Sequence, residues 1–529
     1  MPKGYLIFEL TCHLPFVKSS CPGEYPQENW LNDAVSNTYL PLLRTLHRMD
    51  IKSVPFKLTF TISPTLASML SDPILQERFV SYLDSRIALG GKEVERTASE
   101  PEKNKLAKMY LEAFLQNKSD FIGLYGMNIL NGFNELQKNG KINLITTFAA
   151  HCYLPFFQSY KSSIEAQIYT AISTHNTMFN STPKGFWLPE LGYCQGIEDI
   201  LKKFNIDYFF TAVHAFLFGS KVPSNGIYAP VQVGDSGIYA FCRDLASSMY
   251  VLSQEDGYPG DFSYREYSRD ISGELDADYL GRDIVYPDGS RVNSGFKYYS
   301  NTDSFRDAKH IYDPDKAAAV VKEHAENFIY NLKKRVKKLL RYTDRPPVIV
   351  CPYDAQVFGH WWLEGIDWLE TVINELAADE DLALISPEEY LAEYDSGEKI
   401  SLSFSSCGNG GYSGDWLNGS NDWIYRHIYS ITDKMTELAN RFPDEGGLKR
   451  RALNHAAREV LLAQASDWPF IMKSGIAAPF AAKQVKEHVT SFLKIYNDLS
   501  GNSVDTEWLT TIERKDSLFP DIDYHIFRG

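Results

Sequence analysis

Ionisable side chains follow several short apolar runs that read as buried β-strands. These residues are His13, His151, Glu190 and Asp354, with His214 as a fifth candidate. In parallel sheets and barrels the carboxyl ends of the strands meet on one face, and the loops there present reacting groups from rigid roots. A single residue of this kind is ordinary, but several at different strand ends predict a shared site.

Asp354 follows the β-branched run 348–350 (VIV), which comes after Pro346 and Pro347. Such a run is typical of a buried strand in a parallel sheet. Taken alone, an Asp in this position more often caps the next helix than reacts. The other strand ends favour the catalytic interpretation.

Three chemistries could use this set of residues. Two histidines and two carboxylates could hold Zn²⁺, but the histidines lack the i, i+4 spacing of a helical metal site. A cysteine nucleophile at 12, 152 or 194 could pair with a histidine, although these cysteines lie in apolar runs that predict burial.

The third chemistry, cleavage of a glycosidic bond between two carboxylates, fits the composition better. Aromatic residues make up 14% of the chain, and several Trp lie beside polar residues, as in WWLEG and GDWLNG. Such rings stack on sugars or serve as large core residues with a polar handle. In a retaining mechanism one carboxylate attacks the anomeric carbon and the other protonates the leaving oxygen, with the two about 5 Å apart.

Short apolar runs alternate with helical periodicity over residues 1 to about 390, which favours a parallel α/β barrel. Predicted strands lie at 5–9, 57–62, 142–148, 185–189, 207–211 and 348–350, and predicted helices at 163–179, 197–204 and 315–341. Residues of about 65–140 read as a helical insertion. Residues 234–295 are rich in Gly, Asp, Tyr and Ser and predict long loops that line a site.

The pattern becomes wholly helical after about residue 400. Predicted helices lie at 423–441, 448–464 and 481–499. We therefore expect two domains: a catalytic barrel over residues 1–400 that contains the insertion, and a C-terminal helical domain over residues 401–529 that completes the cleft.

The net charge and the positions of the cysteines limit which partners and which cellular compartment are expected. The formal net charge is −15 with a pI near 5.4, so nucleic acid is not an expected partner; the basic segment at 333–340 reads as a solvated helix face. The cysteines at 12, 21, 152, 194, 242, 351 and 407 are odd in number and scattered. We expect a reducing, cytoplasmic location, with no membrane span and no structural zinc.

Three longer segments and two tripeptides resemble glycoside hydrolase family 57, especially its α-amylase-like and α-1,4-glucan branching members. They are HLP at 13–15, GFWLPELGYCQG at 185–196, CPYDAQVFGHWWLEG at 351–365, DWLNGSNDWIYRH at 415–427 and SDW at 466–468. The resemblance covers nearly the whole chain.

The resemblance implies a distorted (β/α)7 barrel with a helical insertion and a C-terminal all-helical domain. It implies a retaining mechanism with Glu190 as nucleophile and Asp354 as general acid/base, without a cofactor or metal. It also implies six glucan-binding residues: His13, Trp30, His151, His214, Trp416 and Asp467. The leading expectation is an α-1,4-glucan branching enzyme, in which a 6-hydroxyl intercepts the glycosyl intermediate on Glu190.

Two positions depart from the family pattern. The stretches that match 264–275 and 405–412 carry cleft aromatics in similar enzymes, where this chain has Gly273 and Cys407. Loss of two stacking planes predicts weaker or altered binding of long glucans. Two alternatives to branching therefore stay open: an α-amylase-type hydrolase, and a catalytically weak glucan-binding protein of the same fold.

Overall fold

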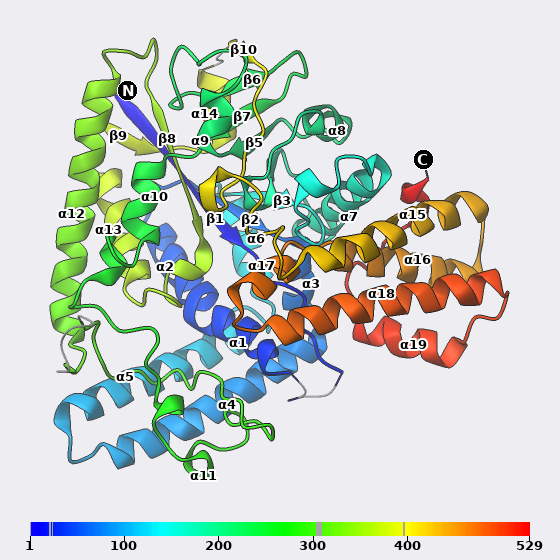
Figure 1. The fold of residues 1–529 in the computed structure, drawn as a ribbon. Helices are drawn as coiled ribbons and strands as arrows, with labels where there is room; N and C mark the ends of the chain where they lie inside the picture. Colours follow the sequence, from blue (N-terminus) through cyan, green and yellow to red (C-terminus); the bar gives the residue numbers. More distant parts are fainter. Residues whose placement is uncertain (1, 21–22, 24, 303–308, 395–396, 529) are drawn as a thin grey trace.

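The computed structural model describes residues 2–528 except 21–22, 24, 303–308 and 395–396. In this described part, seven parallel strands form the centre of the molecule (Figure 1). They are β1 (Gly4–Cys12), β2 (Leu58–Ile62), β3 (Ile142–Thr147), β4 (Gly185–Trp187), β5 (Tyr208–Thr211), β7 (Tyr239–Cys242) and β8 (Val348–Asp354). Each strand pairs with the next around the ring, and β1 pairs with both β2 and β8.

A narrow contact closes the ring between β7 and β8. Arg243 pairs in parallel with Val350, and the N–H of Asp244 donates to the Val350 carbonyl at 2.8 Å. The chain thus forms the expected distorted (β/α)7 barrel. Three short strands extend the sheet at its edges: β6 (Val231–Val233), β9 (Leu382–Leu384) and β10 (Lys399–Ile400).

The barrel interior changes from apolar to polar along the strands. Side chains alternate between the two faces of a strand, so Val348, Val350 and Asp354 face the same way. Val348 and Val350 belong to a buried cluster with Ile145, Phe210 and other residues. Towards the carboxyl ends of the strands the interior residues become ionisable, which is the arrangement that a catalytic face requires.

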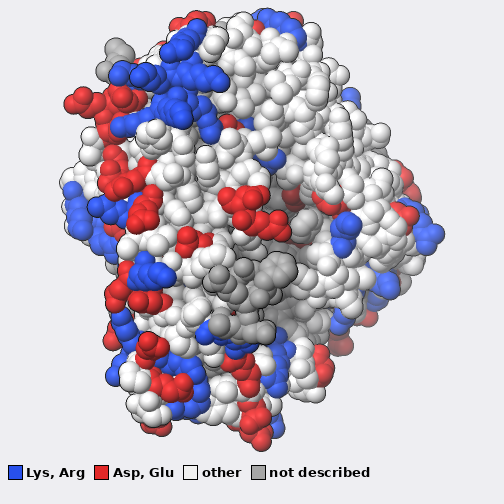
Figure 2. Space-filling view, turned by 60° about the vertical axis from the view of Figure 1, so that its left-hand side comes forward, with Lys and Arg blue, Asp and Glu red and all other residues white. Residues whose placement is uncertain are grey.

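Helices cover the outside of the barrel. They are α1 (Asn29–Ala34), α2 (Leu40–Ile51), α7 (Lys161–Phe179), α8 (Ile197–Lys203), α9 (Val213–Leu217), α10 (Leu245–Leu252), α12 (Pro314–Leu339), α13 (Gly365–Ala377) and α14 (Pro387–Glu393). The basic segment lies at the end of α12, where Lys333 pairs with Asp379 and Arg335 with Asp244. Figure 2 turns this side forward and shows Lys and Arg gathered near its top, with acidic side chains interspersed below.

Between β2 and β3 the chain forms α3 (Pro64–Leu70), α4 (Pro73–Arg96), α5 (Pro101–Ser119) and α6 (Leu130–Lys138). Long α4 and α5 pack together at the bottom of Figure 1, beside the loops that carry α11 (Ala277–Leu280). The hydroxyls of Tyr279 and Tyr298 in those loops both donate to Glu93 of α4 at 2.7 Å. The loops between β7 and β8 are therefore anchored on these helices.

The prediction of loops over 234–295 was wrong in part. The segment contains β7, which is one of the seven barrel strands, and α10. Strand β7 has only four residues, YAFC, and such a short run between turn residues gives too weak a periodic signal to detect.

Five helices form the C-terminal region at the right of Figure 1: α15 (Tyr425–Arg441), α16 (Gly447–Ala463), α17 (Asp467–Ser474), α18 (Ala478–Ser500) and α19 (Thr506–Lys515). This region touches the barrel at the catalytic face, where Ala465 bridges to Cys152 and the N–H of Ser466 donates to the His151 carbonyl at 3.0 Å. Over the described residues, none of the helices combines the length and the apolar character that a membrane span needs.

Candidate active site

The ends of β1, β3, β4 and β8 bring four predicted residues to one face of the barrel. The imidazole rings of His13 and His151 stack with centroids 3.8 Å apart and planes 10° from parallel. Both carboxylates lie within electrostatic reach of His13, because a charge on it lowers the pKa of Glu190 and of Asp354. The structure therefore brings Glu190, Asp354, His13 and His151 together at the carboxyl-end face of the barrel.

Glu190 sits on a strained turn directly after β4. Its backbone has φ 59° and ψ 20°, a left-handed conformation that costs a non-glycine residue energy and recurs at functional sites. The N–H of Cys407 fixes this turn by donating to the Glu190 carbonyl at 2.7 Å. The hydroxyl of Ser466 donates to Oε1 at 3.1 Å, and the Cys407 thiol faces Oε2 at 3.8 Å.

The pKa of Glu190 is raised to about 7. Burial is the main cause, and the negative charge of Asp467 adds to it, while the hydrogen bond from Ser466 acts in the opposite direction. A carboxyl with a pKa near neutrality, in a cleft beside a second carboxyl, is characteristic of acid–base or covalent catalysis.

Asp354 is the last residue of β8. Its side chain caps the turn that follows and also faces the proposed catalytic site. Its Oδ1 accepts the N–H of Gln356 at 2.8 Å, as the capping alternative predicted. Its side chain is exposed to the cleft, yet the surrounding protein desolvates the carboxylate and raises its pKa to about 6. Capping and catalysis are thus compatible, because one oxygen holds the turn and the other stays available.

A hydrogen-bond chain fixes the tautomer of His151. When Glu190 is ionised, Ser466 donates its only hydroxyl hydrogen to it, so the ring nitrogen Nδ1 of His151 must carry the proton it gives to Ser466 at 3.0 Å. Burial and the neighbouring His13 hold the pKa of His151 well below its usual range. Its buried Nε2, which has no partner among the described residues, is then an acceptor for a ligand hydroxyl.

His13 is held from both sides. Its Nε2 lies 3.0 Å from Asp467 of α17, and its Nδ1 lies 2.8 Å from the hydroxyl of Ser63 at the end of β2. Since a carboxylate can only accept, Nε2 is a donor. Asp467 and Ser63 therefore orient this ring in the cleft.

The other predicted glucan contacts lie at different depths. His214, on α9, accepts the N–H of Ser406 at 3.2 Å, and so it braces the loop that carries Cys407. Trp416 is only 1% exposed and stacks on Tyr153 with centroids 4.6 Å apart. In this structure Trp416 supports the loop from the interior and does not present a free ring face.

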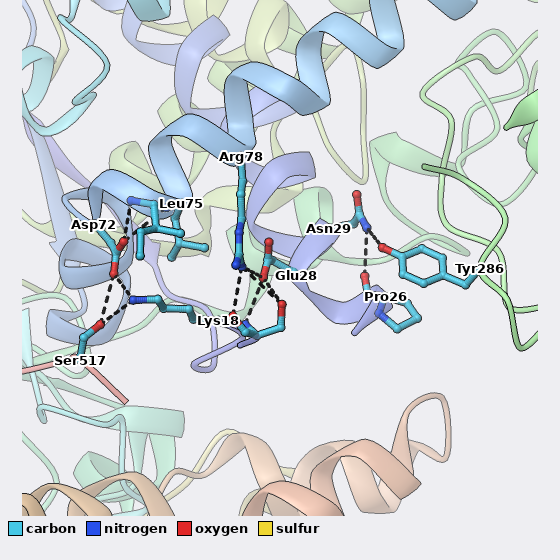
Figure 3. A network of polar contacts seen from close by, with 11 residues as sticks. Lys18, Pro26, Glu28, Asn29, Asp72, Leu75, Arg78, Tyr286 and Ser517 are labelled. Carbon is cyan, nitrogen blue, oxygen red and sulfur yellow. Dashed lines mark hydrogen bonds and ion pairs between the residues drawn. The ribbon is translucent and has the colours of Figure 1, made fainter. Parts of the chain in front are cut away.

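Trp30 is partly buried at the start of α1 and meets Phe480 edge-on at 6.0 Å. The segment before it is tied down by the network in Figure 3. There Lys18 donates to Asp72, Arg78 donates to Glu28 at 2.7 Å, and Asn29 donates to the hydroxyl of Tyr286 at 2.8 Å. These bonds connect the N-terminal segment to α4 of the helical insertion and to the loops between β7 and β8, and so fix the position of Trp30.

Sequence reasoning missed three residues of this face. Ser466 lies inside the SDW motif, but only its neighbour Asp467 was selected. Arg243 follows β7, and it would have been selected as a strand-end residue if β7 had been predicted. Its Nε is buried without a partner among the described residues. Glu9 is fully buried in the barrel, accepts from Thr61 at 2.5 Å and has a pKa raised to about 8 by burial.

The structure argues against a cysteine nucleophile. Cys12, Cys152 and Cys194 are buried and free, and burial raises the pKa of each thiol, in Cys194 to about 12. A thiol protonated at neutral pH is a poor nucleophile. Cys21 lies outside the described residues.

Among the described residues, two groups of side chains come close enough to consider a metal ion: His13, His151 and Asp467, and His455, Glu459 and Asp516. In the first group the rings stack nearly parallel at 3.8 Å, so their in-plane lone pairs do not converge on an ion about 2 Å from each nitrogen. In the second, Arg458 donates to Nδ1 of His455, which leaves Nε2 protonated and unable to ligate. The geometry of both groups favours hydrogen bonding.

Two family models together match most of the chain. The family model described as Glycosyl hydrolase family 57 matches residues 7–403, and the model described as 1,4-alpha-glucan branching enzyme, C-terminal, matches residues 427–527. The 1,4-alpha-glucan branching enzyme TK1436 of Thermococcus kodakarensis is 30% identical over 98% of this chain and 77% of its own.

Solved structures are similar over the whole chain. The alpha-amylase AmyC of Thermotoga maritima superposes with a TM-score of 0.92 at 36% identity, covering 99% of both chains. The branching enzyme of Pyrococcus horikoshii superposes with a TM-score of 0.89 at 28% identity, covering 100% of this chain and 97% of that chain.

Proposed function

Because the chain belongs to glycosyl hydrolase family 57, we propose that it acts on α-1,4-glucans by a retaining mechanism and transfers the cleaved chain to a 6-hydroxyl. The substrate class follows from its relatives, which are branching enzymes and an α-amylase by name. The roles of the two carboxylates come from the resemblance of their motifs to the family, and the strained turn at Glu190 supports them.

Glu190 is the proposed nucleophile and Asp354 the proposed acid/base. Glu190 attacks the anomeric carbon as the bond to the leaving O4 breaks, and O4 takes the proton of Asp354. In the second half, Asp354 takes the proton of an acceptor hydroxyl, whose oxygen displaces Glu190 from the anomeric carbon. The strained, hydrogen-bonded turn supports the first role, since it fixes the attacking oxygen.

The two carboxyls share about one proton between pH 6 and pH 7, given pKa values of about 6 for Asp354 and about 7 for Glu190. Catalysis needs that proton on Asp354. Because Asp354 is exposed to the cleft, a bound glucan covers it and raises its pKa further. Substrate binding thereby shifts the shared proton to the proposed acid.

The C-terminal region completes the cleft in this proposal. It contributes Ser466, which donates to Glu190, and Asp467, which orients His13. The observation that favours branching over hydrolysis is the match of residues 427–527 to a C-terminal model of branching enzymes. Hydrolysis stays the second candidate, since AmyC, named an alpha-amylase, is 36% identical and superposes closely.

Incubation with amylose separates the two reactions. Branching forms α-1,6 linkages without a matching rise in reducing ends, and hydrolysis releases reducing ends alone. Debranching followed by chain counting measures the first, and a reducing-end assay measures the second. Reducing ends without new α-1,6 linkages would replace the branching proposal with the hydrolytic one.

A further inference from the structure

A surface groove of about 630 Å³ is lined by residues of α18 and α19 and lies outside the proposed catalytic site. Both helices belong to the C-terminal region (Figure 1). Its lining residues are Pro479, Ala482, Lys483, Lys486, Glu487, Thr490, Ser491, Lys494, Trp508 and Lys515. Nothing in the proposed mechanism uses these residues.

The lining combines apolar surface with hydrogen-bonding groups. Pro479, Ala482 and Trp508 provide apolar area, and Thr490 and Ser491 provide hydroxyls. Lys494 lies over the Trp508 ring, 4.5 Å from its centroid, and so holds the indole in the wall of the groove. A sugar has the complementary surface, with an apolar ring face and a rim of hydroxyls.

Neighbouring carboxylates compensate three of the four lysine charges, and the fourth lysine, Lys486, lies over the Trp423 ring at 5.5 Å. Lys515 lies 2.6 Å and Lys483 lies 3.6 Å from Glu487, and Lys494 lies 3.0 Å from Asp498. Ammonium groups in such pairs still donate hydrogen bonds, but they attract anions weakly. The groove therefore suits a neutral, hydroxyl-rich ligand better than a phosphate.

The groove has the length and position for a polymer. Its residues on α18 run from Pro479 to Lys494, about 22 Å of helix, which is enough for several sugar rings in a row. At the Pro479 end, Lys483 donates to the hydroxyl of Tyr25 at 2.7 Å, and Phe480 meets Trp30. The groove thus begins beside the segment that carries Trp30, a predicted glucan contact.

We infer that the groove between α18 and α19 is an accessory binding site for an α-1,4-glucan chain, an inference that rests on the proposed function. Occupancy of the groove holds a long chain next to the cleft and raises its effective concentration there. The gain applies only to glucans long enough to reach both places.

Two variants test the site independently of folding. Trp508→Ala removes the indole, and Thr490→Trp fills the groove from an exposed helix position. Tyr330→Ala, a 64% exposed aromatic on α12, is the matched control. We expect both groove variants to raise KM for amylose about fivefold to tenfold, to leave kcat/KM for short maltooligosaccharides unchanged, and the control to match the parent.

If the parent converts amylose and Thr490→Trp leaves the KM for amylose unchanged, the accessory site is overturned and the proposed function stays intact. If the parent binds amylose in affinity electrophoresis but does not convert it, the proposed function is overturned. In that case, loss of amylose binding in Thr490→Trp still supports the groove as a glucan site. Displacement of amylose by millimolar inorganic phosphate would show an anion site and reject the glucan assignment.

Discussion

Ser466 of the C-terminal region donates a hydrogen bond to Oε1 of Glu190 at 3.1 Å, although 276 positions separate the two residues in sequence. The same hydroxyl lies 3.0 Å from Nδ1 of His151. One side chain outside the barrel therefore lowers the pKa of the proposed nucleophile and fixes the tautomer of a neighbouring histidine.

Glu190→Gln removes the proposed nucleophile at nearly constant size. We expect the turnover of amylose to fall at least about 1,000-fold, because an amide cannot form the glycosyl intermediate. Circular dichroism and amylose retention should match the parent. Glu326→Gln, at an exposed site on α12, is the control; if Glu190→Gln keeps parental turnover, the nucleophile lies elsewhere.

The pH dependence of kcat/KM reports the carboxyl pair of the free enzyme. Activity falls at low pH because Glu190 must be ionised, and it falls at high pH because Asp354 must be protonated. With pKa values of about 7 and about 6 respectively, the productive form is roughly 6% of the enzyme at its maximum near pH 6.5, and it is about one tenth as abundant as the form with the proton on Glu190. A flat profile from roughly pH 5 to 8 would contradict these protonation states.

Ser466→Ala tests the hydrogen bond that lowers the pKa of Glu190. Its loss, worth about 1.4 kcal/mol, raises that pKa by about one unit. Because the pKa of Glu190 lies above that of Asp354, the alkaline limb of the kcat/KM profile reports the titration of Glu190. In Ser466→Ala this limb therefore moves up by about one pH unit, and the maximum of kcat/KM falls about tenfold. Ser474→Ala, in the last turn of α17 and bonded to the Ile471 carbonyl, should leave the profile unchanged.

Gly273→Trp and Cys407→Trp place aromatic planes at the two positions where the family pattern predicts them. Gly273 has open space around its Cβ position, so an indole fits there. A stacking gain of about 1 kcal/mol lowers KM for amylose about fivefold. Gly91→Trp, at an equally open position on α4, is the control. Cys407 contacts Glu190, so its variant also loses the thiol contact and should gain less. An unchanged KM in both variants rejects the role of these positions.

Glu459→Gln tests the buried core of the C-terminal region. Glu459 lies 2.8 Å from His455 and 2.7 Å from His488, and all three side chains are at most 1% exposed. Loss of the carboxylate removes the hydrogen-bonded counter-charge of His488, whose pKa it raises. We expect the free energy of unfolding to fall by about 2–4 kcal/mol, measured by urea denaturation. Glu437→Gln, exposed on α15, should change it by less than about 0.5 kcal/mol.

Most of the architecture could be predicted from local patterns. The strands that became β1, β2, β3, β4, β5 and β8 carry runs of apolar or β-branched residues, and the long helices show their period clearly. Strand β7 could not be found in this way, because four residues show too little alternation to distinguish a strand from a loop.

The site was predicted unevenly for a similar reason. Glu190 and Asp354 are visible in sequence because each ends an apolar run. Ser466 and Arg243 give no such signal, since a serine before a helix and an arginine after a short run are common everywhere in proteins. Trp416 carries a motif, but motif membership does not tell whether a ring is exposed or packed against Tyr153.

The sequence by itself determined the fold class and which residues end the strands, because side-chain periodicity and strand boundaries are local properties of the chain. Only the tertiary structure decided how these residues act together. Closure of the barrel brings the ends of β1, β3, β4 and β8 to one face, and the docking of α17 brings Ser466 onto Glu190. Hydrogen bonds, burial and pKa values depend on distances across the fold, and those distances exist only once the chain has folded.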